Sequence, residues 1–295
     1  MTTVSTYAQA PAVGVGANGH QGVEVGPDGA LWATLNAQGA GDVGLYRIDP
    51  ATRAYQLVAG SLVGPEVFTL APGGAYWVLS SVQSGTGNVL LRIRLSDGDV
   101  TVIPDTTGGG KAPVAPSFRP SNGDLYWMNY NTGVLHRRPN YMSATGETTV
   151  ATGVAGVEDL FFASDDTCWV CQYGPGYPSA LRQLNPSTGA VLATWSGPSG
   201  PEGVAELDGD LYVVSRPDAS VWKLDRSAGT YTRIIGAAGV GYQDGDAAVA
   251  KFEYPSVIVA DEGRLYIGEI APSRRMRQVD VNDPGSGWHV DLVMP

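Results

Sequence analysis

The sequence contains few of the residues on which most catalytic and nucleic-acid-binding sites depend. Among its 295 residues are two cysteines, three histidines and only three lysines, Lys111, Lys223 and Lys251. The net charge of −11 argues against nonspecific binding to DNA, RNA or anionic membranes, because contacts with phosphate need lysine and arginine. We therefore expect no nucleic-acid partner, and we expect a ligand that is neutral, cationic or carbohydrate-like.

Long apolar runs are also missing. No window approaches the roughly 18 consecutive apolar residues of a membrane span, so we expect no membrane insertion. The opening MTTVSTYAQAPAVG has neither a basic region nor a long apolar stretch, and so does not look like a secretory signal. We expect a soluble protein that is cytoplasmic at synthesis.

The two cysteines, Cys168 and Cys171, lie in TCWVCQ. A Cys-x-x-Cys pair can be a redox pair or half of a zinc site. Here the flanking residues predict a β-strand, in which residues three apart point to opposite faces. No second Cys or His pair completes a zinc site. We predict two buried structural thiols.

Glycine, proline and an internal repeat dominate what is present. Forty glycines, twenty prolines and 43% hydrophobic residues are typical of many short strands and tight turns around a core. No run shows helical periodicity. A turn followed by an aromatic residue recurs six times at intervals of 43 to 54 residues, at Trp32, Tyr76, Tyr126, Trp169, Tyr212 and Tyr266.

A second repeated phrase follows each aromatic residue, in the order YRID, LRIR, HRRP, RQLN, WKLD and RQVD. Its alternation is that of a strand, and further short strands flank both phrases. Each unit is therefore four strands, which cannot bury both faces alone. Six such units predict an all-β, six-bladed β-propeller with four-stranded antiparallel blades. We expect the recurring Trp or Tyr to pack between adjacent blades.

The two ends of the chain are less regular. We assign residues 21–295 to the propeller and residues 1–20 to an N-terminal arm or closing strand. The stretch VSTYAQA (4–10) predicts a strand that either closes the ring or reaches a partner, and both alternatives stay open. The last strand of the sixth unit is predicted at GWHVDLV (287–293).

Basic residues recur at equivalent points of the third strands, at Arg47, Arg92, Arg137 and Lys223. Like charges on separate blades do not form one patch. We predict solvated outer-edge residues that discourage edge-to-edge pairing of strands.

Residues 241–269, GYQDGDAAVAKFEYPSVIVADEGRLYIGE, resemble the NHL repeat through Asp244-Gly245, Ala250, Phe252, Pro255-Ser256 and Gly263-x-Leu265-Tyr266. The match departs at Gly268-Glu269, where that family has Ala-Asp. VGPDGALWATL (25–35) resembles the repeats of streptogramin-lyase-type propellers. These resemblances imply a propeller over nearly the whole chain. They do not imply one function, because the architecture hosts lactonases, lyases and binding modules.

Propeller ligands usually bind at one end of the central channel, beside the starts of the inner strands and the loops after the second strands. The starts hold Glu66, Glu158 and Glu202, and the positions after the aromatic residues hold Asn129, Gln172, Arg216 and Glu269. These are our candidate ligand-binding residues.

Carboxylates with an asparagine could hold Ca²⁺ or Mg²⁺. Resemblance to gluconolactonase-type propellers would imply a catalytic metal there. Their Glu-Gly-Pro strand start is absent, because the order here is Pro65-Glu66 and Pro201-Glu202-Gly203. We favour solvated polar channel residues and expect no cofactor, with the metal identity of any such site unknown.

Tyr130, Tyr173 and Tyr177 lie in Gly-, Asn- and Pro-rich segments predicted at the same end of the ring. Tyrosine in such loops is a common binding anchor. Local loop packing explains it equally well.

Catalytic motifs are missing: there is no G-x-S-x-G, no H-E-x-x-H, and no phosphate-binding loop. We expect His20 and His136 to be structural or solvated. Resemblance to lyase-type propellers would imply an active-centre histidine, and His289 is the only late candidate. The balance favours a protein that is not an enzyme.

We therefore predict a non-catalytic binding or structural module that presents one ring face to a protein or glycan partner, within a larger assembly. The chain also resembles minor tail proteins of tailed phages, which would imply a virion location and a tail-tip, receptor-contacting role. The alternatives are a metal-dependent lactonase or hydrolase of the gluconolactonase type, and a streptogramin-lyase-like enzyme.

Overall fold

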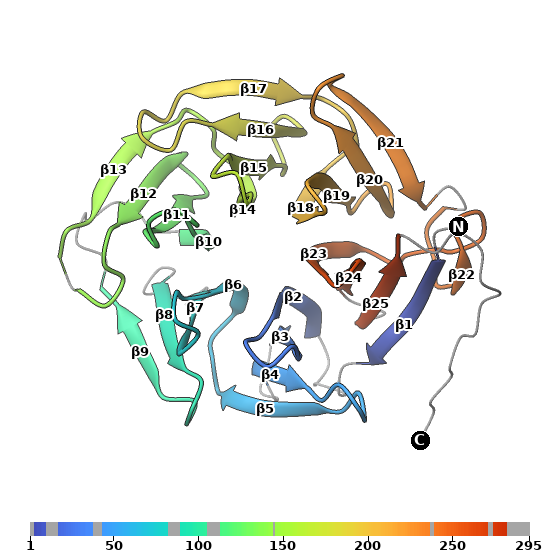
Figure 1. Ribbon diagram of the computed structural model, residues 1–295, viewed down its shortest axis with the longest axis horizontal. Coiled ribbons are helices and arrows are strands. Elements are labelled where there is room, and N and C mark those ends of the chain that lie inside the picture. Colours follow the sequence, from blue (N-terminus) through green and yellow to red (C-terminus); the bar gives the residue numbers. More distant parts are fainter. Residues whose placement is uncertain are drawn as a thin grey trace.

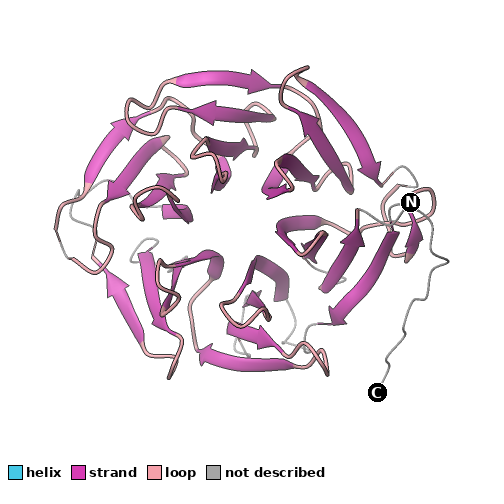
Figure 2. Cartoon of the chain, in the orientation of Figure 1, coloured by secondary structure: helices cyan, strands magenta, loops and turns pink. Residues whose placement is uncertain are grey.

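The computed structural model describes residues 3–9, 17–37, 43–81, 89–104, 113–143, 145–236, 239–270 and 274–281. These residues form six antiparallel sheets arranged as blades around a central axis, and they contain no helix (Figures 1 and 2). The described part of the chain accordingly has no helix long and apolar enough to cross a membrane. The predicted six-bladed β-propeller with four-stranded blades is confirmed.

Each of the first five blades runs from the axis outwards, one strand after the next. The first blade consists of β2 (Ala17–Val25), β3 (Leu31–Ala37), β4 (Gly44–Ile48) and β5 (Tyr55–Gly60). The second consists of β6 (Pro65–Leu70), β7 (Tyr76–Ser81), β8 (Val89–Arg94) and β9 (Val100–Ile103). The third consists of β10 (Pro113–Phe118), β11 (Leu125–Asn129), β12 (Val134–Arg138) and β13 (Thr148–Ala151). The fourth blade consists of β14 (Val157–Phe162), β15 (Cys168–Gln172), β16 (Ala180–Leu184) and β17 (Val191–Trp195). The fifth consists of β18 (Pro201–Leu207), β19 (Asp210–Ser215), β20 (Ser220–Asp225) and β21 (Thr230–Ile235). The sixth consists of β23 (Pro255–Asp261), β24 (Arg264–Glu269) and β25 (Arg275–Asp280), with β1 (Thr3–Gln9) and β22 (Gly245–Asp246).

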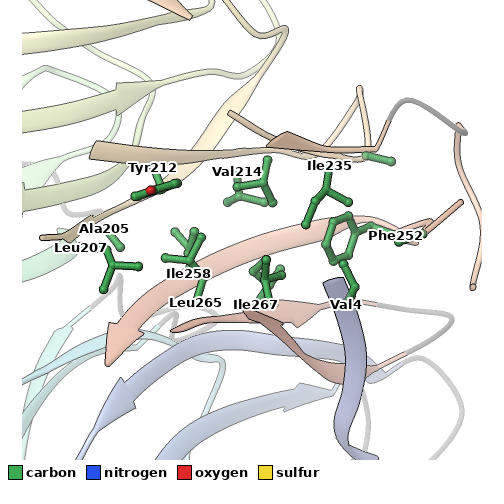
Figure 3. Packing of buried hydrophobic residues seen from close by; sticks show 14 residues of the cluster. Val4, Ala205, Leu207, Tyr212, Val214, Ile235, Phe252, Ile258, Leu265 and Ile267 are labelled. Atoms are coloured by element: carbon green, nitrogen blue, oxygen red, sulfur yellow. The ribbon is translucent and has the colours of Figure 1, made fainter. Parts of the chain in front are cut away.

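The sixth blade is completed by the N-terminal strand. β1 pairs antiparallel with β25, with Val4 opposite Val279 and Ser5 opposite Gln278, and the short β22 pairs with the start of β1. Val4 is 1% exposed in the core between the fifth and sixth blades (Figure 3). The first strand of the chain thus closes the ring. The segment 287–293, predicted as the last strand, lies outside the described residues.

The recurring aromatic residues pack between neighbouring blades, as predicted. The ring of Trp32 lies 5.3 Å from that of Trp77 in the second blade, and the ring of Tyr126 lies 5.0 Å from that of Phe162 in the fourth. Tyr212 belongs to a buried cluster shared with the sixth blade (Figure 3). Since each blade buries its apolar faces only against its neighbours, these contacts hold the ring together.

The second blade departs from the predicted alignment. The repeat predicts Tyr76 at the position that Trp32 occupies in the first blade. The pairing shows Val78 there instead, because Val78 lies opposite Arg92 as Trp32 lies opposite Arg47. Six residues separate the paired residues Leu70 and Trp77, whereas five separate Val25 and Leu31, so an alignment on the glycines of the turns falls out of register.

Three of the four repeated basic residues of the third strands pair with acidic residues at or just before the start of the second strands, whereas Arg92 lies over the ring of Tyr76. The pairs are Arg47–Asp28, Arg137–Asp124 and Lys223–Asp210. These basic residues lie on β4, β12 and β20, and each of those strands is covered by the outer strand of its blade. The predicted position at an outer edge is therefore wrong, although the three side chains remain partly exposed to solvent, and an ion pair links the two repeated phrases in three blades.

Both cysteines of β15 are free and buried, as predicted. Cys168 packs in the cluster shared with the third blade, and Cys171 packs in the cluster shared with the fifth, so the two thiols point to opposite faces. Burial raises the pKa of Cys168 to about 12, which keeps this side chain a protonated thiol at neutral pH.

Candidate functional site

One residue from each blade lines a cavity of about 310 Å³ on the axis of the ring. Five of the six directly follow the residue that pairs with the last residue of the second strand, and Gln21 follows His20, which pairs with Leu35 two residues before the end of β3. The six are Gln21, Glu66, Val114, Glu158, Glu202 and Ser256. Val67, Val257 and Tyr130 complete the wall. We call this space the mouth cavity.

A β-bulge gives four of these residues their special position. In β18, Pro201 lies opposite Ser215 and Gly203 lies opposite Val214, so Glu202 has no cross-strand partner. The same single extra residue occurs in three other blades, at Gln21, Glu158 and Ser256. Bulges re-aim side chains and are frequent beside functional sites. The bulge thus recurs in four of the six blades and directs one side chain of each of them towards the axis.

The three glutamates of the mouth cavity have different neighbours. Glu202 is 8% exposed, and one of its carboxylate oxygens accepts a hydrogen bond from Arg216 Nη1 at 3.0 Å. Glu158 is hydrogen-bonded by the hydroxyl of Tyr130. Glu66 makes no side-chain hydrogen bond or ion pair with any described residue.

Burial is the main cause that raises the pKa of each of these carboxyls. The pKa of Glu66 rises to about 7, with a further contribution from the charge of Glu158. The pKa of Glu158 rises to about 7, and that of Glu202 rises to about 8 although Arg216 opposes the rise. Burying these carboxylates in ionised form therefore costs free energy that the surrounding protein does not fully offset.

Tyr130 forms part of the cavity wall and is supported by Tyr177. The two rings meet edge to face, with centroids 5.8 Å apart and planes at 86°. A Cβ atom on Gly174 would lie 2.4 Å from the Tyr130 hydroxyl, and one on Gly156 would lie 2.3 Å from the Tyr177 ring. Glycine at both positions lets the tyrosine pair pack this closely against the loops.

Three other candidates from the sequence lie outside the mouth cavity, at the ends of second strands. Gln172 donates a hydrogen bond to the carbonyl of Ala155 at 2.7 Å, and Glu269 accepts one from the N–H of Glu253 at 2.8 Å. Both side chains hold the polypeptide that leads into their own blade. Asn129 accepts hydrogen bonds from the N–H groups of the turn that follows it. These are structural contacts.

The last two candidates lie beside the cavity. Arg216 reaches it through its ion pair with Glu202 and is itself 42% exposed. Tyr173 is half-buried next to Gly200 and does not belong to the lining. The structure therefore brings Glu66, Tyr130, Glu158, Glu202 and Arg216 together, with Tyr177 as their support.

Sequence reasoning missed part of the lining and a second cavity. Val114 and Ser256 occupy the same place in their blades as the glutamates, and Gln21 lies at a bulge as two of the glutamates do, so an alignment of all six strand starts would have found them. A second cavity of about 270 Å³ adjoins the first and shares Glu202 with it. It contains Glu24 and Asp159, whose pKa values burial raises to about 8 and about 6.

The lining does not fit a metal centre. No group of three or more His, Cys, Asp or Glu in the described ranges is arranged to hold an ion. His20 is buried with one ring nitrogen 2.6 Å from the Tyr55 hydroxyl, and burial lowers its pKa to about 4. His136 pairs with Glu147 at 2.8 Å within the third blade. His289 lies outside the described residues.

No protein-family model and no curated protein matches the chain, so membership of the NHL family is not shown. Several solved structures share its fold. An auxiliary nutrient binding protein from Bacteroides thetaiotaomicron is 16% identical, with 95% of this chain and 76% of that chain covered and a TM-score of 0.73. One from Bacteroides ovatus is 15% identical, with 94% and 76% covered and a TM-score of 0.70. The PQQ-bound aldose sugar dehydrogenase from Streptomyces coelicolor is 12% identical, with 95% and 98% covered and a TM-score of 0.71. At these identities the likeness shows the fold alone.

Proposed function

We propose that the protein is a non-catalytic binding propeller whose ligand site is the mouth cavity. The observation behind the proposal is the convergence of six residues, one from each blade, on a space of about 310 Å³ beside Tyr130. Cavities of this size with a few convergent polar groups and an aromatic wall are typical small-molecule sites. Two similar structures are auxiliary nutrient binding proteins by name, which supports a binding role.

The ligand that we propose is a hydroxyl-rich group, such as the terminal sugar of a glycan, either free or attached to a partner protein. The glutamates, Gln21 and Ser256 offer hydrogen-bonding groups, and the ring of Tyr130 offers an apolar surface with a polar tip. No feature of the described residues supports a phage tail role, so the proposal does not include one.

The enzymatic alternatives receive less support from these residues. A gluconolactonase-type reaction would need several carboxylates close enough to share an ion, and the described residues contain no such group. Lyase-type chemistry would need a histidine at the mouth cavity. Neither His20 nor His136 lines it.

A monosaccharide panel tests the proposal by NMR chemical-shift perturbation on the labelled protein. We expect at least one sugar to bind, and Glu202→Gln and Tyr130→Phe to weaken its affinity about tenfold. Glu24→Gln is the matched control, since Glu24 is an inner-strand carboxyl of the second cavity. Affinity that survives both mouth substitutions, or that falls only with Glu24→Gln, would show that the mouth cavity is not the site.

A further inference from the structure

The charges around the mouth cavity do not balance. Three glutamates line it, and Arg216 is the only basic side chain that the described residues bring to them. Arg216 is bonded to Glu202 at 3.0 Å, and it lies at the rim with 42% of its side chain exposed. One arginine can neutralise one carboxylate, so two carboxylates remain without a counter-ion.

Glu66 is the least compensated of the three. Glu202 has Arg216 and Glu158 has the Tyr130 hydroxyl, whereas Glu66 has no partner among the described residues. The neighbouring charge that acts on Glu66 is the like charge of Glu158. An acceptor that is partly buried, faces a cavity and has no partner is a place where an external cation would lower the free energy.

The wall also offers apolar surface for the rest of a ligand. Val67, Val114 and Val257 lie between the polar groups, and Tyr130 presents its ring beside Glu158. An ammonium group over an aromatic ring is attracted by the ring quadrupole. Carboxylates, one aromatic ring and aliphatic patches together suit a cation that carries a carbon frame.

We propose, resting on the binding function above, that the mouth cavity selects small organic cations. The charged nitrogen lies between Glu66 and Glu158, and the carbon frame lies against Tyr130 and the valines. Hydroxyl groups of the same ligand pair with Gln21 and Ser256. Amino sugars and small amino alcohols belong to this chemical class.

A metal ion suits the cavity less well. Ca²⁺ and Mg²⁺ need several oxygen ligands at about 2.0–2.6 Å. The described residues contain no group of three acidic or other ligating side chains with that arrangement. The space of about 310 Å³ also far exceeds the volume of roughly 30 Å³ that one water molecule takes in the liquid. An organic ion with several heavy atoms matches that space better.

Matched pairs of a cation and a neutral compound of similar shape test the proposal. The pairs are choline with 3,3-dimethylbutan-1-ol, and 1,4-diaminobutane with 1,4-butanediol, titrated at pH 8 and followed by NMR. We expect wild-type protein to bind the cation of at least one pair tenfold or more tightly than its neutral partner. Glu66→Gln, which keeps the shape and removes the charge, should abolish that preference. Glu24→Gln should preserve it.

The outcomes separate this inference from the proposed function. The cation proposal is overturned if no pair shows a preference, or if the preference survives Glu66→Gln. Neutral sugars that still bind and still depend on Tyr130 would then leave the proposed function standing. If neither cations nor sugars bind, both proposals fail.

Discussion

The glutamates inside the blades and the glutamates at the mouth cavity differ in what surrounds them. Glu269 is fully buried and meets Arg277 Nη1 at 3.0 Å. Glu147, whose side chain is equally buried, meets Arg138 Nη2 at 2.8 Å. Where the fold withdraws these acids from water, it supplies a cation from the same blade. Burial of charge requires such a partner if the protein is to remain stable.

The mouth glutamates lack this provision. Arg216 is bonded to Glu202 alone, and burial raises the pKa of each of the three to about 7 or 8. The interior carboxylates are bonded to arginines of their own blades, whereas Glu66 and Glu158 have no ion pair among the described residues. This difference separates residues that maintain the fold from residues that are available to a ligand.

Removing an interior cation should have the largest effect on stability. Arg277 is fully buried and donates hydrogen bonds to Glu269, to Asp244 and to the carbonyls of Gln243 and Lys251. Arg277→Met should lower the free energy of unfolding by about 3–5 kcal/mol, because it leaves a buried carboxylate unpaired. Urea denaturation measures the change. If the free energy of unfolding falls by less than about 1 kcal/mol, the interior carboxylates do not depend on their arginines and do not differ in this respect from those of the mouth cavity.

The mouth acids should instead make stability depend on pH. Folded Glu66, Glu158 and Glu202 keep protons up to about pH 7 or 8, whereas the unfolded chain releases them near pH 4.5. Acids with raised pKa values favour the folded state at low pH, so the free energy of unfolding should fall by ~2 kcal/mol or more between pH 5 and pH 8.

The triple variant Glu66→Gln, Glu158→Gln, Glu202→Gln tests that assignment by urea denaturation at both pH values. It should be more stable than wild type at pH 8 and should show a smaller fall from pH 5. If the free energy of unfolding of the variant falls between pH 5 and pH 8 as much as that of wild type, other groups, such as Glu24, cause the pH dependence.

Removing the positive charge of Arg216 should have the smallest effect on stability. Arg216 is 42% exposed, and ion pairs of exposed side chains contribute about 0–1 kcal/mol. Arg216→Gln should therefore change the free energy of unfolding by less than about 1 kcal/mol. It should also increase the affinity for choline a few-fold, because it removes a like charge from the rim. Weaker choline binding would show that Arg216 contacts the ligand favourably.

The fold was predictable because its signal is repeated. Six copies of a turn, an aromatic residue and a following strand outweigh any single irregularity, and the error at Tyr76 affected only one blade. That error arose because the longer turn precedes two adjacent aromatic residues, Tyr76 and Trp77. A local phrase cannot show which of two neighbours faces which blade.

The site was predictable only in part, for a reason of side-chain direction. Glu158 and Glu202 follow the residue that begins the pairing of the inner strand, and a bulge frees them. Gln172 and Glu269 end second strands, where alternation along the strand turns the side chain into the blade. Tyr130, one position after Asn129, leaves the strand and reaches the cavity, whereas Tyr173, one position after Gln172, does not. Sequence spacing alone does not separate these positions.

The most direct test of the contrast is the titration of the glutamate carboxyl carbons by NMR, with each mouth resonance assigned from its Gln variant. We predict that Glu66 and Glu158 titrate near pH 7 and Glu202 near pH 8, and that choline lowers the midpoint of Glu66. Titration midpoints near 4.5 that choline does not shift would contradict the claim that these carboxyls are buried without enough counter-ions and bind a ligand cation.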